Sequence, residues 1–139
     1  MISITRTFDA PRERVFDAWT DPARFAHWFG GAGTTVEDVS MDVRPGGGWR
    51  ARMVLDGGSE IPWRGVYQEV DRPSRLVLTL TDRPGDEFEL VTVVLKEVEG
   101  GTEMTFTQEG GHMPPSQYAQ AEQGWRAFFD AMAEVLASP

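Results

Sequence analysis

The sequence contains no cysteine and only two histidines, His27 and His112, among 139 residues. The absence of cysteine excludes disulfides, zinc sites with thiolate ligands and thiol nucleophiles. Two histidines are too few for a catalytic metal centre built on imidazole ligands, and neither has a neighbour in the sequence that suggests a catalytic dyad. We therefore expect no metal, no cofactor and no assignable catalytic residue, and we interpret both histidines as surface or capping residues.

Positive charge and long apolar runs are also scarce. The chain has 13 Lys and Arg against 22 Asp and Glu, a net charge of −9. Nucleic-acid binding needs a basic surface, so we expect no nucleic-acid partner. No apolar run has the length of a membrane span, and the N-terminus lacks the apolar core of a signal peptide. The composition predicts one cytoplasmic domain over residues 1–139.

Glycine and proline divide the rest of the chain into short periodic segments. Residues 2–8 alternate between apolar and polar, which predicts a strand. Asp9 is the expected N-cap of a first helix, and Thr20-Asp21-Pro22 is expected to begin a second. Between residues 34 and 109 the apolar period is two, which predicts six strands with short links. Strands joined by such short links must be antiparallel.

The C-terminal segment returns to a helical period. Ser116 is its expected N-cap, and the helix is expected to run for about 20 residues, long enough to cross the sheet. An antiparallel sheet with its helices on one face is an α+β fold. The apolar stripe of this helix consists of Tyr118, Ala121, Trp125, Phe128, Phe129, Met132, Val135 and Leu136.

Large side chains are abundant, with five Trp, eight Phe and six Met. Alternation places Trp49 and Met53 on one face of their strand, and on the next strand we assign Trp63 and Tyr67 to the inward face because aromatics bury the most surface. Such residues either close into a dry core or line a ligand cavity. The cavity hypothesis names Trp19, Trp28, Phe29, Met41, Trp49, Met53, Trp63, Tyr67, His112, Trp125 and Phe129.

Several polar features have simpler interpretations. The acidic groups at 37–38, at 86–89 and at 97–99 lie near strand ends or on outward positions, and we expect solvated edge charge there, Glu89 included. The run Pro45-Gly-Gly-Gly48 lacks the Lys-Ser/Thr ending of a phosphate loop and precedes a strand. We interpret it as a hairpin turn that needs positive φ.

An ordered set of motifs resembles one known family over essentially the whole chain. The motifs are Phe8-Asp-Ala-Pro11, Val15-Phe-Asp-Ala-Trp19-Thr-Asp-Pro22 with Trp28, Asp42-Val-Arg-Pro-Gly-Gly47, Gly65-Val-Tyr67-Gln-Glu-Val70-Asp-Arg-Pro73-Ser-Arg-Leu76, Gly101-Thr102 and Gly124-Trp125. The family is named for the C-terminal domain of the activator of heat shock protein 90 ATPase, in the START-like (SRPBCC) superfamily. The resemblance implies a helix-grip fold, in which a seven-stranded antiparallel sheet wraps around the long C-terminal helix and leaves a deep cavity.

Three functions follow from these observations and from the resemblance. The first is a protein that binds a small hydrophobic or aromatic molecule in the cavity. The second is an enzyme of the cyclase, aromatase or dehydratase kind, with Tyr67, His112 or an inward acid moving protons. The third is a chaperone-linked interaction module that docks through Arg50, Arg52 and Arg64 on the outer face of the sheet. Edge strands with few charges also permit a homodimer.

Overall fold

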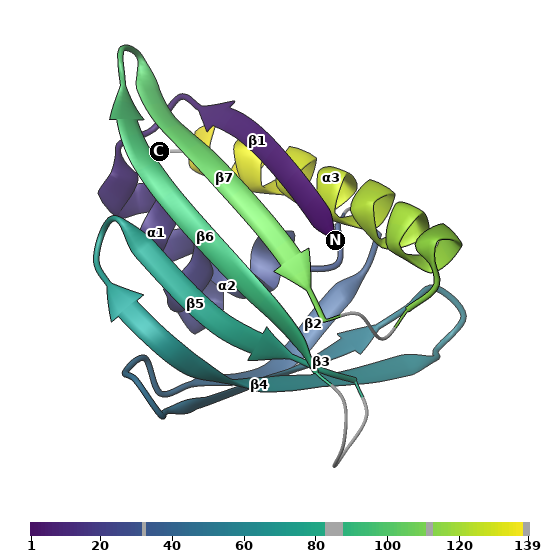
Figure 1. Ribbon diagram of the computed structural model, residues 1–139. Coiled ribbons are helices and arrows are strands. Elements are labelled where there is room, and N and C mark those ends of the chain that lie inside the picture. The colour runs from purple at the N-terminus through teal and green to yellow at the C-terminus, as the bar shows by residue number, and fades with distance from the viewer. Residues whose placement is uncertain (32, 83–87, 111–112, 138–139) are drawn as a thin grey trace.

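The computed structural model describes residues 1–31, 33–82, 88–110 and 113–137. Within these residues, seven strands form one antiparallel sheet in the order β1-β7-β6-β5-β4-β3-β2, with three helices on one side of it (Figure 1). The strands are β1 (Ile2–Phe8), β2 (Thr35–Met41), β3 (Gly48–Val54), β4 (Glu60–Asp71), β5 (Arg75–Leu80), β6 (Glu89–Val98) and β7 (Gly101–Glu109). The helices are α1 (Arg12–Thr20), α2 (Pro22–Trp28) and α3 (Pro115–Ala137).

Two of the expected helix caps are wrong, and proline explains both. The N-cap of α1 is Pro11, not Asp9, and no side chain caps that helix. A proline disfavours helical geometry in the residue before it, so the helix begins only after Pro11. In α3 the first residue is Pro115, which needs no hydrogen bond at that position, and Ser116 lies inside the first turn. The predicted start of α2 at Thr20-Asp21-Pro22 is confirmed, and Asp21 is its N-cap, whose side chain accepts from the Ala23 N–H.

Strands β3, β4 and β5 approach one another closely at Gly65. Gly65 lies opposite Trp49, whose indole N–H passes over it and donates to the Thr79 carbonyl at 2.9 Å. A Cβ on Gly65 would lie 1.8 Å from that carbonyl oxygen and 2.6 Å from the indole nitrogen. Glycine therefore lets the backbones approach, and Trp49 joins β3 to β5 across β4.

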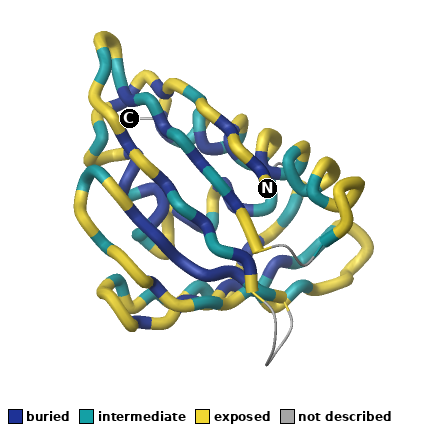
Figure 2. The backbone as a smooth tube through the Cα atoms, in the orientation of Figure 1, coloured by how far each residue is buried: buried dark blue, intermediate teal, exposed yellow. Residues whose placement is uncertain are grey.

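The core fills the space between the concave face of the sheet and the helices. Buried positions alternate along most strands, whereas β5 is buried almost throughout (Figure 2). Helix α3 packs against α1, α2 and β1, and it buries Trp125, Phe129, Met132 and Leu136. The α+β helix-grip fold predicted from the sequence is confirmed, including the strand count and the long final helix.

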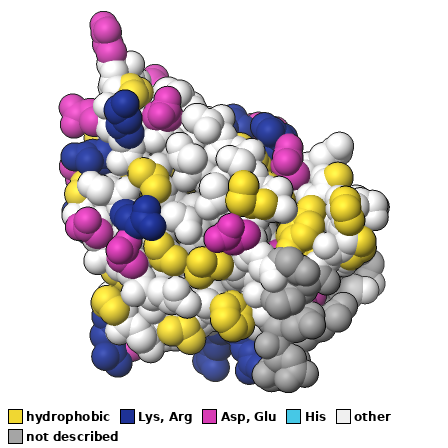
Figure 3. Space-filling model, in the orientation of Figure 1, with side chains coloured by type: hydrophobic (Ala, Val, Ile, Leu, Met, Phe, Trp, Pro, Cys, Tyr) yellow, Lys and Arg dark blue, Asp and Glu magenta, His cyan; other side chains and the backbone are white. Residues whose placement is uncertain are grey.

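The outer face of the sheet carries mixed charge, with hydrophobic side chains scattered between charged ones (Figure 3). Arg50 and Arg64 are exposed and lie directly opposite each other on β3 and β4. Arg52 instead forms ion pairs with Glu37, at 2.6 Å, and with two further carboxylates. These carboxylates, Glu60 most of all, raise the pKa of Arg52. The three arginines therefore do not form one unpaired basic patch.

None of the helices in the described part of the chain combines the length and the hydropathy that crossing a bilayer requires.

Candidate functional site

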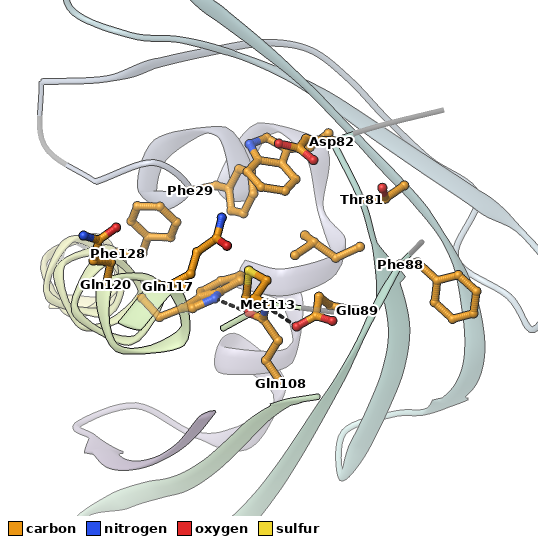
Figure 4. A pocket seen from close by; sticks show the side chains of 15 residues that line it. Phe29, Thr81, Asp82, Phe88, Glu89, Gln108, Met113, Gln117, Gln120 and Phe128 are labelled. Carbon is orange, nitrogen blue, oxygen red and sulfur yellow. Dashed lines mark hydrogen bonds between the residues drawn. The ribbon is translucent and has the colours of Figure 1, made fainter. Parts of the chain in front are cut away.

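A cavity of about 430 Å³ lies between the N-terminal half of α3 and the part of the sheet where β5 ends and β6 begins (Figure 4). Phe29, which follows α2, and Trp63 of β4 contribute aromatic walls. From the sheet side come Leu80, Thr81, Asp82, Glu89 and Gln108. From α3 come Gln117, Gln120, Ala121, Gly124, Trp125 and Phe128. The lining is thus largely apolar and aromatic, with a few polar groups, as is typical of ligand pockets.

A chain of hydrogen bonds runs across the inner wall of this cavity. The Trp125 indole N–H donates to Gln108 Oε1 at 2.6 Å, and Gln108 Nε2 donates to Glu89 Oε1 at 3.1 Å (Figure 4). All three side chains are buried, and Glu89 is only 8% exposed. The second carboxylate oxygen, Glu89 Oε2, is buried and has no hydrogen-bond partner among the described residues. The Glu89 carboxylate therefore has one oxygen held by Gln108 and one buried oxygen without a partner in the described residues.

Strand periodicity puts these polar groups inside. Glu89 is in phase with the buried Val91 and Val93 of β6, and Gln108 is in phase with the buried Phe106 of β7. Because the strands are antiparallel, with Val91 opposite Gln108, the first inward position of β6 and the last of β7 meet at the same end. The expectation that Glu89 is solvated edge charge is therefore wrong. Its phase with Val91 was the signal that identifies it as an inward residue.

The indole N–H groups divide into two classes. Those of Trp28, Trp49 and Trp125 donate to the Ala18 carbonyl, the Thr79 carbonyl and Gln108, at 2.6–2.9 Å. Those of Trp19 and Trp63 are buried and have no acceptor within the described part of the chain. A buried donor without a partner costs about 1–3 kcal/mol. Trp63 lines the cavity with its ring, whereas its N–H is buried.

Helix α3 has a glycine at the cavity wall. Gly124 lines the cavity, and a Cβ built on it meets no atom within 4 Å. Glycine in a helix interior is less stable than alanine by about 1 kcal/mol. Since neither backbone angle nor crowding calls for glycine here, its structural consequence is the open space that it leaves beside Trp125.

The residues named in the cavity hypothesis fall into three places. Phe29, Trp63 and Trp125 line the cavity described above. Beneath Phe29 and Trp125 is a void of about 10 Å³, bordered in addition by Trp19, Met41, Trp49 and Tyr67. That volume is at the lower limit for a single water molecule. Trp28, Met53 and Phe129 line neither space and are packed in the buried core. His112 lies outside the described residues.

Sequence reasoning did not name most of the polar lining. Gln108, Gln117 and Gln120 were absent from the cavity hypothesis because it selected aromatic and sulfur-containing side chains. Their signal was positional: Gln108 continues the inward phase of β7, and Gln117 and Gln120 precede Gly124 by seven and four residues on α3. Residues at these spacings lie on one face of a helix.

In the described residues, no three His, Asp or Glu side chains gather as a metal site requires.

Tyr67, the proton-transfer candidate of the enzyme hypothesis, lies deep in the fold. It is 2% exposed and borders the small void, not the larger cavity. Burial, and secondly the negative charge of Asp42, raises the pKa of Tyr67 well above its ordinary value. A phenol held protonated and away from the cavity is poorly placed to exchange protons with a molecule there.

Comparisons with known proteins agree with this fold. Among solved structures, a protein from Chromobacterium violaceum is 24% identical with a TM-score of 0.88, covering 99% of this chain and 98% of that one. A protein from Arthrobacter aurescens is 23% identical with a TM-score of 0.86, covering 99% and 86%. No significant match to a curated protein was found. Residues 9–137 match the family model described as Activator of Hsp90 ATPase homolog 1-like protein. The chain therefore belongs to this family, within the SRPBCC-type helix-grip proteins.

Proposed function

We propose that this protein binds a small hydrophobic or aromatic molecule in the cavity between α3 and the sheet. The observation that carries the proposal is the aromatic cavity of about 430 Å³ with buried polar groups on its wall. Ligand pockets for small molecules have volumes of about 300–1,000 Å³ and a similar balance of apolar surface and convergent polar groups. The family resemblance supports the same function.

Two features favour a binding site over a simple packing defect. The Gln108 side chain fixes the Trp125 ring through a hydrogen bond of 2.6 Å, so one wall of the cavity is preformed. Gly124 keeps the facing stretch of helix without a side chain, at a cost in helix stability. A preformed apolar wall lowers the ordering cost of binding, since fewer side chains lose freedom when a ligand enters.

A neutral fluorescent probe tests the proposal. N-phenylnaphthylamine emits strongly in apolar surroundings and weakly in water, so titration into the purified protein reports binding directly. The matched variants are Gly124→Leu, which places a leucine in the cavity, and Ala119→Leu, which adds the same side chain at an exposed position of α3. We expect the affinity of Gly124→Leu to fall at least about tenfold and that of Ala119→Leu to stay unchanged.

Two results would contradict the proposal. One is a dye that does not respond to the wild-type protein at all. The other is a response that Gly124→Leu and Ala119→Leu reduce equally, because the dye would then lie elsewhere. Thermal unfolding of each variant, measured alongside, separates loss of the cavity from loss of the fold.

A further inference from the structure

We propose that the ligand of this cavity is an amine, whose positive charge is balanced by the nearby Glu89 carboxylate while its apolar body lies among the aromatic walls. This inference rests on the proposed function and names the chemical class of the ligand. It excludes fatty acids and other anions as the preferred occupants.

The first observation is the state of the Glu89 carboxyl group. Oε1 is held by Gln108 at 3.1 Å, and Oε2 is buried without a partner in the described residues. A buried acceptor that lacks a donor is costly, and hydrogen bonds to charged groups contribute more than neutral ones. Figure 4 shows the Glu89 carboxylate among the side chains that line the cavity, reached by the hydrogen bond from Gln108. Its hydrogen bonds among the described residues therefore compensate the charge of this carboxylate only in part.

The second observation is the sign of the charge around the cavity. Among its described lining residues the charged ones are Asp82 and Glu89, and both are acidic. Opposite charges attract more strongly in a partly buried site than in water, and like charges repel more strongly. The Glu89 carboxylate therefore favours a cation over a neutral group of the same shape and disfavours a carboxylate or phosphate.

The third observation is the aromatic lining. Phe29, which follows α2, Trp63 of β4 and Trp125 of α3 line the same space. Aromatic faces attract ammonium groups and also bury the apolar part of an amine. The site thus fits an apolar amine better than a simple hydrocarbon.

Displacement of N-phenylnaphthylamine by three matched competitors tests the inference. Naphthylethylamine, naphthylethanol and naphthylpropionate share one ring system and differ in the head group. We expect the amine to displace the dye at a concentration at least about tenfold lower than the alcohol, with the acid weakest. In Glu89→Gln, which keeps an acceptor for Gln108, the amine is expected to fall to the level of the alcohol. Glu97→Gln removes an exposed carboxylate from the same strand and is expected to leave the order unchanged.

The outcomes separate this inference from the proposed function. If the dye binds but the alcohol or the acid competes as well as the amine, or if Glu89→Gln keeps the full preference for the amine, the inference is overturned and the binding function stands. If the dye does not bind, both are contradicted. If Glu89→Gln does not fold, the order of the three competitors on the wild-type protein still decides.

Discussion

The two halves of α3 face the same sheet but do different things. Toward the C-terminus, Phe129, Met132 and Leu136 are buried in a packed core. Toward the N-terminus, Gln117, Gln120 and Gly124 border an open cavity. The two halves differ in the side chains that face the sheet. In the C-terminal half each turn contributes a large apolar side chain, whereas in the N-terminal half these positions hold small or polar residues. One amphipathic helix can therefore complete a packed core with one half and border a cavity with the other.

The neighbours of α3 reinforce this difference. In the C-terminal half, the Phe129 ring lies 6.1 Å from the rings of Trp19 and Trp28, which come from α1 and α2. In the other half, Trp125 marks the boundary, because its ring packs against the core ring of Phe106 at 4.6 Å and also lines the cavity. Ring packing therefore holds the C-terminal half of α3, the closed half, in place. At the N-terminal half, the open half, hydrogen bonds from Trp125 to Gln108 and from Gln108 to Glu89 hold the cavity wall.

The largest expected effect comes from breaking the closed half. Trp28→Ala removes a fully buried ring together with its hydrogen bond to the Ala18 carbonyl, and we expect it to lower the free energy of unfolding by about 3–5 kcal/mol. Trp63→Ala, at the cavity wall, is expected to cost clearly less because that ring borders open space. Denaturant unfolding of both variants measures the difference. Equal losses would mean that the two regions are packed alike.

A smaller effect follows from cutting the polar wall of the open half. Gln108→Leu leaves the Trp125 N–H and both Glu89 oxygens without partners, and we expect a loss of about 2 kcal/mol. Adding Glu89→Leu is expected to recover part of that loss, since the buried carboxylate is then gone. Denaturant unfolding of the two single variants and the double variant gives the coupling energy. Strictly additive losses would show that the residues do not act together.

Alkaline pH probes the buried phenol at the boundary between core and void. Because burial raises the pKa of Tyr67, the folded protein keeps this proton at pH values where the unfolded chain loses it. The contribution of Tyr67 to the free energy of unfolding is therefore unchanged below about pH 10. Above that pH the free energy of unfolding falls by up to about 1.4 kcal/mol per pH unit. Tyr67→Phe is expected to lack this component. Unfolding curves at several pH values compare the two proteins, and parallel losses above pH 10 would argue against a buried Tyr67 hydroxyl.

The smallest effect is a gain. Gly124→Ala is expected to stabilise the protein by up to about 1 kcal/mol, because alanine favours the helix and its Cβ meets open space. Ala119→Gly, at an exposed position of the same helix, is expected to lose a similar amount. Thermal unfolding reports both changes. A destabilised Gly124→Ala would mean that the space beside Trp125 is filled.

Much of the fold was predictable because each element has its own period. Alternation in the strands and the stripe from Tyr118 to Leu136 are local patterns, and local patterns predict local structure. The helix caps at Asp9 and Ser116 were mispredicted because a neighbouring proline set the boundary in both cases.

The site was less predictable than the fold. Trp49 of β3 and Trp63 of β4 are both inward aromatics, but only Trp63 lines the larger cavity, so alternation does not separate a core ring from a cavity wall. Glu89 was misjudged because two acids precede it in the sequence, although its phase with Val91 indicates burial. The hydrogen bonds that join Glu89, Gln108 and Trp125 are visible only in the three-dimensional structure, because the three residues belong to different elements.

The most direct test of the contrast between the two halves is a proton–nitrogen correlation spectrum recorded with and without N-phenylnaphthylamine. Each tryptophan gives its own indole N–H signal, so core and cavity are observed in one experiment. We predict that the Trp63 and Trp125 indole signals and the Gly124 amide signal shift, while the Trp28 indole signal does not. Shifts at Trp28 without shifts at Trp63 and Gly124 would contradict the account and place the binding region in the core.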